Sequence, residues 1–188
     1  MPFNGHRRPG NHAKSEEKLK ALFLVPFSIS FLIIGLLLVN IFAEEKNIDP
    51  IIGKKLSNFT LPSMIEGEDD FSYKDIQGRY VLINIFASWC VTCKIEHESL
   101  MQITERQNIP LYGIAWNDNR VNLHGWFKER GNPYKKIGID NNSVVILDLG
   151  VTAVPESFLI SPDGIIIYRH AGALDYESYV KNIKPLIK

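Results

Sequence analysis

The sequence predicts an α/β fold in which helices flank a central mixed sheet, preceded by one membrane-spanning helix. Three observations predict it. Short β-branched and aromatic runs alternate along the chain with segments of helical periodicity. Two late strand-like runs are joined by Pro162-Asp163-Gly164, which is a hairpin turn signal. Near the N-terminus, residues 21–43 form an apolar run without a charged side chain.

The composition excludes several classes of protein. A length of 188 residues suits one domain with an appendage. The 21 basic and 21 acidic side chains cancel, which argues against a nucleic-acid-binding protein. Two cysteines are too few for a disulfide-rich mini-protein or a four-cysteine zinc module. The hydrophobic fraction of 45% argues against a disordered chain.

The balanced charge is a sum over unlike parts of the chain. Residues 1–20 carry +3, residues 21–43 carry none, and residues 44–188 carry −3. At about 1.5 Å per residue, the apolar run reaches about 34 Å, which exceeds a hydrocarbon core of about 30 Å. Because Lys and Arg stay on the cytoplasmic side, the tail over 1–20 is expected in the cytoplasm. The run over 21–43 is then expected to be a transmembrane anchor, which in a bacterium would lie in the inner membrane.

The rest of the chain is expected in the periplasm, with a linker over 44–50 and a folded domain over 51–188.

A cleaved signal peptide is the main alternative to an anchor. Its apolar region usually has about 7–15 residues and ends in a small-x-small site. Ile41-Phe42-Ala43 offers one small residue where two are needed. A buried core helix is the other alternative, although such a helix usually has a polar side.

The first half of the domain alternates strands and helices. Residues 80–87 (YVLINIFA) predict a strand buried on both faces. Residues 91–107 predict a helix with Ile95, Leu100, Ile103 and Thr104 near one face. A strand over 111–116 and a helix over 121–130 follow, and Gly131-Asn132-Pro133 closes that helix. This order implies parallel strands joined by helical crossovers.

The second half adds an antiparallel pair. Residues 144–149 are apolar and predict a short strand or a buried segment. Residues 157–161 and 165–170 predict the two strands of the hairpin. Asp175 is expected to cap a final helix over 176–187.

Both cysteines lie in one C-x-x-C motif, Cys90-Val91-Thr92-Cys93, where the first predicted strand gives way to a helix. A helix N-terminus stabilises a thiolate, because its free N–H groups and its dipole favour negative charge. The thiolate is the attacking form in disulfide exchange. Cys90 is therefore expected to attack a substrate disulfide, and Cys93, one turn further, to resolve the mixed disulfide.

Other uses of the two thiols are less favoured. Haem attachment requires C-x-x-C-H, and position 94 is Lys. A zinc half-site would need two further ligands. A structural disulfide would close a very small loop with little entropic benefit. A copper site made by Cys90, Cys93 and a distant histidine stays as a further alternative.

Five motifs resemble the thioredoxin superfamily and, more narrowly, the membrane-anchored DsbE/CcmG thiol:disulfide interchange proteins of cytochrome c maturation. W-C-x-x-C alone is typical of any thioredoxin-like protein, while the combination is typical of this family. The motifs are N-I-F-A-S-W-C-x-T-C-K-x-E-H at 84–97, GNPY at 131–134, LDLGV at 147–151, P-E-x-F-L-I at 155–160 and YRHAG at 168–172.

The resemblance implies a thioredoxin fold, with a redox-active disulfide between Cys90 and Cys93. It also implies that Pro155 is a cis-proline facing the cysteines. Residue 154 would then offer its backbone to an extended substrate strand. An ordinary loop proline is the alternative. Trp89 is expected to pack beside Cys90 and shield it.

Several polar residues match the same family positions. Asn84 stands where general thioredoxins carry a buried acid, so it cannot relay a proton. Glu96 and Glu156 are candidate acids near the site, and the alternative for each is a solvated or capping carboxylate. His97 and His170 are more readily explained as packed or hydrogen-bonded residues than as catalysts.

Two positions depart from the family pattern. The family usually has proline where this chain has Val91, and the dipeptide between the cysteines influences the redox potential. Residues 115–118 (AWND) replace a region where the family often has a tyrosine and a basic residue. That replacement leaves open which partner contacts form there.

The resemblance implies a specific reductant that needs no cofactor. Its substrates would be disulfides of apocytochrome c or of a CcmH-like haem-lyase subunit, and a DsbD/CcdA-like membrane dithiol carrier would supply electrons. A general periplasmic disulfide oxidase or isomerase is the alternative enzyme. A copper-binding thiol chaperone is the alternative from another functional class.

Overall fold

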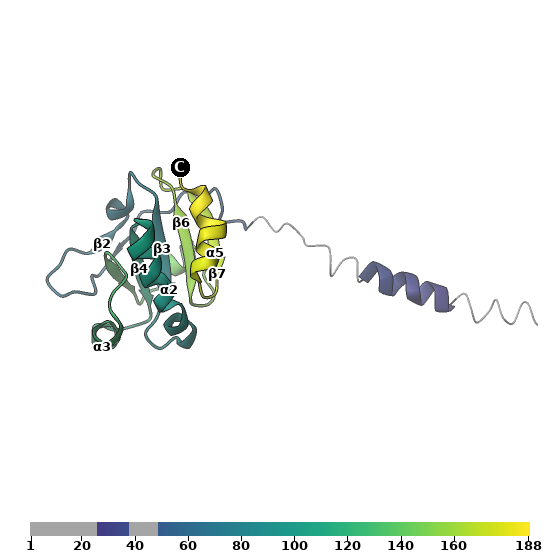
Figure 1. Cartoon of the computed structure of the whole chain (residues 1–188), viewed down its shortest axis with the longest axis horizontal. Helices are drawn as coiled ribbons and strands as arrows, with labels where there is room; N and C mark the ends of the chain where they lie inside the picture. The colour runs from purple at the N-terminus through teal and green to yellow at the C-terminus, as the bar shows by residue number, and fades with distance from the viewer. Residues whose placement is uncertain (1–25, 38–48) are drawn as a thin grey trace, which may run out of the picture. The chain divides into compact units, whose positions relative to one another are not determined.

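A five-stranded mixed sheet with the strand order β5-β4-β3-β6-β7 forms the centre of the domain (Figure 1). The computed structural model describes residues 26–37 and 49–188. Strands β3, β4 and β5 run parallel, and β6 is antiparallel to both β3 and β7. The predicted mixed sheet and its C-terminal hairpin are therefore confirmed. The strands are β3 (Val81–Phe86), β4 (Leu111–Trp116), β5 (Ile137–Asp140), β6 (Glu156–Ile160) and β7 (Ile166–Ala171).

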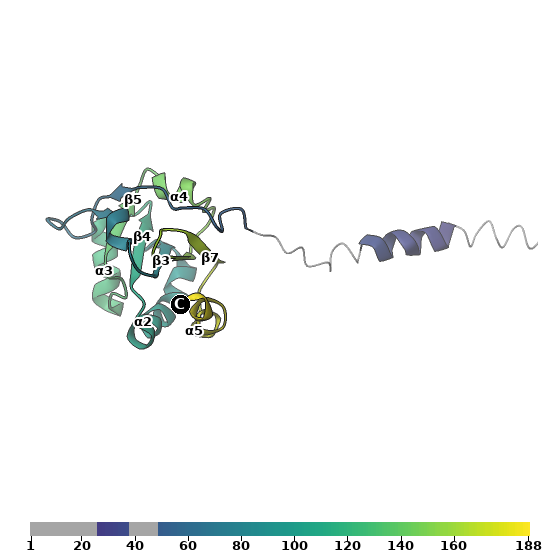
Figure 2. The same ribbon diagram turned by 90° about the horizontal axis from the view of Figure 1, so that it is seen from above.

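Helices cover both faces of this sheet (Figure 2). One face packs against α2, α3 and the C-terminal helical segment. The other face packs against α4 and a two-stranded ribbon, β1-β2, with the short helix η1. The bounds are α2 (Val91–Gln107), α3 (Arg120–Arg130), α4 (Val144–Asp148), α5 (Tyr176–Ser178), η2 (Tyr179–Ile183), η3 (Lys184–Leu186), β1 (Thr60–Leu61), β2 (Phe71–Ser72) and η1 (Tyr73–Ile76).

Strand β3 has no exposed side chain, as its uninterrupted apolar run predicts. Successive side chains alternate between the faces, so Leu82 and Phe86 face α2 while Ile83 and Ile85 face α4. Asn84 lies between Leu82 and Phe86 in this alternation. Its amide therefore belongs to the face that carries α2.

Residues 144–149 were predicted to be a short strand or a buried segment, and the structure contradicts only the strand, since Val145, Ile146 and Leu149 are buried. Val144–Asp148 form the helix α4, because the carboxylate of Asp140 accepts the N–H groups of Val144, Val145 and Ile146 at 2.8, 2.8 and 3.1 Å. Those are the N–H groups that the first turn of a helix leaves free. Strand β5, which carries Asp140, was not among the predicted strands.

Two details of the predicted helices also change. Ile95 was expected on the buried face of α2, but 70% of its surface is exposed. Cys93, Glu96, His97, Leu100 and Ile103 form the buried face instead. Asp175 caps the final helix as predicted, by accepting the N–H of Ser178. That helix changes after one turn into η2, which is π-helical, and then into η3.

The chain divides into two units, at residues 1–47 and 48–188. In the first, residues 26–37 form a helix with exposed apolar side chains such as Phe27 and Phe31. No helix within residues 26–37 and 49–188 has the length and apolar character needed to cross a membrane. The predicted tail over 1–20 and both ends of the predicted anchor over 21–43 lie outside the described residues.

Candidate active site

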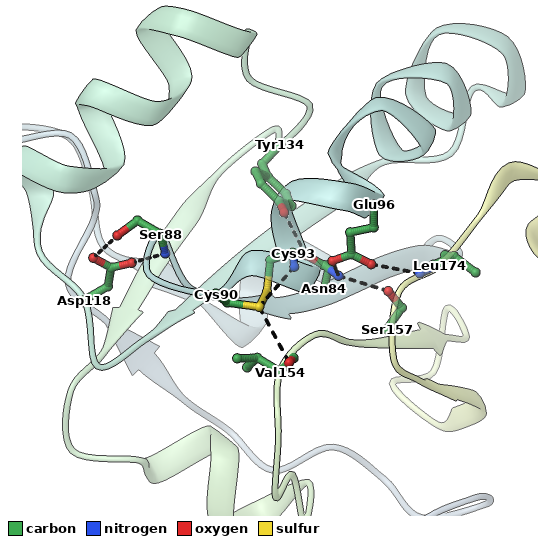
Figure 3. Close-up of a disulfide and its surroundings, with 10 residues drawn as sticks. All are labelled: Asn84, Ser88, Cys90, Cys93, Glu96, Asp118, Tyr134, Val154, Ser157 and Leu174. Atoms are coloured by element: carbon green, nitrogen blue, oxygen red, sulfur yellow. Dashed lines mark hydrogen bonds between the residues drawn. A yellow bond between two sulfur atoms is a disulfide. The ribbon is translucent and has the colours of Figure 1, made fainter.

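The two cysteines lie at the corner between β3 and α2. Cys90 is the N-cap of α2, and its Sγ accepts the N–H of Cys93 at 3.0 Å. Cys90 and Cys93 form a disulfide with a Cα–Cα distance of 5.3 Å (Figure 3). Only 6% of Cys90 and 1% of Cys93 is exposed. The structure thus brings the two predicted residues together as one disulfide at a helix N-terminus.

A cis peptide bond joins Val154 to Pro155, as the resemblance implies. Pro155 leads directly into β6, whose first residue, Glu156, pairs with Ile85 of β3. This pairing brings the Val154–Pro155 bond to the same end of the sheet as the disulfide. The carbonyl oxygen of Val154 lies 3.6 Å from Cys90 Sγ.

A buried polar network lies behind the disulfide (Figure 3). The Asn84 amide donates to Glu96 Oε1 at 3.0 Å and to Ser157 Oγ at 3.1 Å. Its own oxygen accepts the Tyr134 hydroxyl at 2.7 Å. The second Glu96 oxygen accepts the N–H of Leu174 at 2.9 Å. All four atoms of the Asn84 and Glu96 head groups therefore have a partner.

Burial governs the protonation of this network. Removal from water raises the pKa of Glu96 to about 7, against the opposing effect of the N–H of Leu174 and the amide of Asn84. Burial likewise raises the pKa of Tyr134 well above its ordinary value, so its hydroxyl stays protonated and donates. Only 2% of Glu96 is exposed, which excludes the alternative of a solvated carboxylate.

Comparisons with known proteins agree with this geometry. Residues 51–186 match the Redoxin family. The chain is 38% identical over 175 residues to the thiol:disulfide interchange protein DsbE of Escherichia coli K12, covering 89% of this chain and 94% of that protein. It belongs to the DsbE family. The protein named DsbE in Pseudomonas aeruginosa PAO1 is 30% identical, with 89% of this chain and 93% of that protein covered.

The fold agrees with solved structures as well. The thioredoxin domain of a thiol-disulfide oxidoreductase from Bacteroides vulgatus superposes with a TM-score of 0.61 at 18% identity. The match covers 73% of this chain and 98% of that structure. The chain therefore has a thioredoxin fold. Its place in the DsbE and Redoxin families identifies it as a thiol:disulfide oxidoreductase.

Glu156 occupies a different environment from Glu96 in this DsbE-family domain. Its Oε2 accepts Arg169 Nε at 2.7 Å, and only 3% of the residue is exposed. Arg169 also contacts Asp49 Oδ2 at 3.1 Å and the carbonyl of Gly150 at 3.3 Å. The hydrogen bond that Arg169 donates to the Glu156 carboxylate raises the pKa of Arg169. Glu156 is thus an ion-paired anchor beside Pro155, which excludes the solvated alternative here too.

The histidines have structural contacts. His97 is buried, which lowers its pKa, and its Nε2 lies 3.2 Å from the carbonyl of Arg130. His170 Nε2 lies 3.1 Å from the carbonyl of Ala173. Both contacts agree with the packed or hydrogen-bonded role expected for these residues.

Trp89 is 54% exposed, and its indole N–H donates to the carbonyl of Asn117 at 3.0 Å.

Across the described ranges, no group of three or more His, Cys, Asp or Glu side chains is arranged to hold a metal ion.

Several residues of the site were not predicted from the sequence. Tyr134 lies in the GNPY motif, but the sequence did not suggest a role for it. Nothing in the sequence singled out Ser157 or Leu174 as site residues. Ser88 and Asp118, which hold the chain just before Cys90, were also missed. Burial and hydrogen bonding at these positions depend on tertiary contacts, which spacing in the sequence does not reveal.

Proposed function

We propose that this DsbE-family protein is a specific periplasmic reductant in cytochrome c biogenesis. The observation that carries the proposal is the Cys90–Cys93 disulfide at the N-terminus of α2, beside Pro155. The likeness to DsbE proteins and the five sequence motifs support the choice of pathway. Its substrates would be disulfides of apocytochrome c or of a CcmH-like haem-lyase subunit.

In the proposed reaction, the reduced protein attacks through Cys90. The Cys90 thiolate forms a bond to one sulfur of the substrate disulfide, and the other substrate sulfur leaves as a thiolate and takes up a proton. The Cys93 thiolate then attacks Cys90 Sγ and releases the first substrate sulfur. Two electrons pass to the substrate, and the protein ends with the Cys90–Cys93 disulfide that the structure contains.

The contacts around Cys90 support this assignment. The N–H of Cys93 already points at Cys90 Sγ, where it would stabilise a thiolate. Val154, next to Pro155, would offer its backbone to an extended substrate segment so that the substrate disulfide lies against Cys90. Ion pairing with Arg169 would hold Glu156, and with it Pro155, in place.

Glu96 is the proposed proton acceptor for Cys93. The two residues are three positions apart on the buried face of α2, which places them on the same side of the helix. A carboxyl group with a pKa of about 7 can take up and return a proton near neutral pH. Asn84 cannot take this role, because an amide does not titrate, but it donates a hydrogen bond to Glu96.

The same proposal includes the location of the protein. An anchor over residues 21–43 would hold the domain on the periplasmic side of the inner membrane. A pair that reduces substrates in an oxidising compartment must be re-reduced, so a DsbD/CcdA-like dithiol carrier is the proposed donor. Protease treatment of spheroplasts tests this location. The added protease reaches only the periplasmic side of the inner membrane, so it should cleave the domain there.

Haem staining of c-type cytochromes tests the physiological role. A strain with Cys90→Ala at the native locus should lose stained cytochromes, and an added small thiol should restore part of them. Normal staining would contradict the proposal. The reduction potential tests the direction of electron flow separately. A reduction potential near that of strong oxidants, about −120 mV, would favour the oxidase alternative over a reductant.

A further inference from the structure

The two residues before Cys90 are held by a cluster of hydrogen bonds from the loop that follows β4. The Asp118 carboxylate accepts the Ser88 N–H at 2.5 Å and the Ser88 hydroxyl at 2.8 Å (Figure 3). The Trp89 indole N–H donates to the carbonyl of Asn117 at 3.0 Å. We call Ser88, Trp89, Asn117 and Asp118 the loop clamp. It joins the β3–α2 corner, which carries Cys90, to the β4–α3 loop.

Asp118 is suited to act as a fixed anchor. Only 5% of the residue is exposed, and its carboxylate also accepts the N–H of Asn119 at 2.8 Å. Three donors therefore converge on one buried carboxylate. A buried acceptor with all its donors in place is costly to disturb, because each donor would lose its partner away from water.

The loop that carries Asp118 is itself held at three points. The N–H of Asp118 donates to Asn141 Oδ1 at 3.0 Å, and the N–H of Asn117 donates to the carbonyl of Asp140 at 3.3 Å. Asn119 caps α3 by accepting the N–H of Asn122 at 3.0 Å. The loop clamp is thus fixed to the end of β5 and to the start of α3, so it can hold the β3–α2 corner rather than follow its movement.

We infer that Asp118 is a positioning residue for the exchange reaction, which holds Cys90 at the N-cap of α2 where the Cys93 N–H can stabilise its thiolate. The inference rests on the proposed role of Cys90 as the attacking cysteine. In the reduced protein no disulfide links the two sulfurs. The position of Cys90 then depends on the segment before it, and the loop clamp supplies that restraint.

The test compares three variants of the full-length chain in reduced form. Asp118→Asn keeps one oxygen but sets an NH₂ group against the Ser88 N–H, while Ser88→Ala removes only the hydroxyl. Asp148→Asn is the matched control, because Asp148 also accepts the backbone N–H and the hydroxyl of a serine, Ser57, at 3.4 and 2.9 Å. Asp148 lies in α4, on the other face of the sheet.

Two measurements report on Cys90. Iodoacetamide alkylation followed by peptide mass spectrometry gives separate rates for Cys90 and Cys93, and absorbance at about 240 nm follows thiolate formation with pH. Asp118→Asn should raise the midpoint of the Cys90 titration by about one pH unit. At pH values below both midpoints, the variant then has about tenfold less Cys90 thiolate. Each thiolate is about threefold more nucleophilic, so alkylation of Cys90 should be about threefold slower.

Ser88→Ala should shift both readouts in the same direction by less, and Asp148→Asn should leave them unchanged. A role limited to stability predicts a lower melting temperature with unchanged Cys90 readouts, and that result would overturn the inference. Ser88→Ala keeps the test decisive if Asp118→Asn does not fold. Faster alkylation of Cys93 than of Cys90 in the unmodified chain would instead overturn the proposed role of Cys90, whatever the variants show.

Discussion

Glu96 should make the stability of the domain depend on pH, and Glu96→Gln should remove that dependence. Burial raises the pKa of Glu96 from an ordinary value of 4.5 to about 7. The folded state therefore binds the proton more tightly than the unfolded chain does. The stability that such a group contributes is fully present below pH 4.5 and is lost as the pH rises through about 7.

The magnitude follows from the two pKa values. One pKa unit corresponds to about 1.4 kcal/mol, so ionising Glu96 in the folded state costs about 3 kcal/mol of stability between pH 4.5 and pH 8. Glutamine resembles the protonated acid, because it too keeps one acceptor for the two donors, Asn84 and Leu174. Relative to the unmodified chain, Glu96→Gln should gain up to about 3 kcal/mol over this pH range.

Urea unfolding of the disulfide-bonded protein at a series of pH values measures this difference, since the bonded cysteines do not titrate. Glu98→Gln on the same helix is the matched control, because Glu98 is exposed. A difference between Glu96→Gln and the unmodified chain that stays constant from pH 4.5 to pH 8 would refute the reasoning. The same result would remove the physical basis for Glu96 as a proton acceptor at neutral pH.

Two further predictions concern packing and charge. Arg169→Met should lower the free energy of unfolding by about 3 kcal/mol, because it leaves the buried Glu156 carboxylate unpaired. Adding Glu156→Gln should recover part of that loss in urea unfolding, and an equal loss in the double variant would contradict the ion-pair explanation. Gly138→Ala should cost about 1–3 kcal/mol, because its Cβ would lie 2.7 Å from Leu61 Cβ. Gly125→Ala, in α3 with open space around it, should instead stabilise by about 0.5–1 kcal/mol, and equal melting temperatures for the two variants would count against this packing.

Sequence patterns predicted the elements that have a regular period or a clear end signal. The apolar run of β3 and the Pro162-Asp163-Gly164 turn were sufficient, since each depends on neighbouring residues alone. Helix α2 was predicted with its observed bounds, Val91–Gln107. The buried face of α2 was assigned wrongly at Ile95, because the polar residues Glu96 and His97 take the buried positions.

Elements that depend on distant contacts were missed or misassigned. Helix α4 is short and apolar, so its pattern does not distinguish a helix from a strand. Its start is set by Asp140, a side chain from another element. For the site, the C-x-x-C motif predicted two cysteines at a helix N-terminus, and the family resemblance implied the disulfide between them. The partners of Glu96 and Asn84 could not be predicted. Leu174 reaches Glu96, and Ser157 and Tyr134 reach Asn84, only in the folded domain.

Trapping the reaction intermediate tests the central claim most directly. The reduced Cys93→Ser variant is mixed with a disulfide-bonded apocytochrome peptide that carries the C-x-x-C-H motif, and the products are analysed by mass spectrometry without reduction. A mixed disulfide between Cys90 and a peptide cysteine should accumulate, because the protein no longer has the Cys93 thiol that would resolve it. The reduced Cys90→Ser variant should form little. No adduct with either variant, or an adduct only with Cys90→Ser, would contradict the assignment of Cys90 as the attacking thiol.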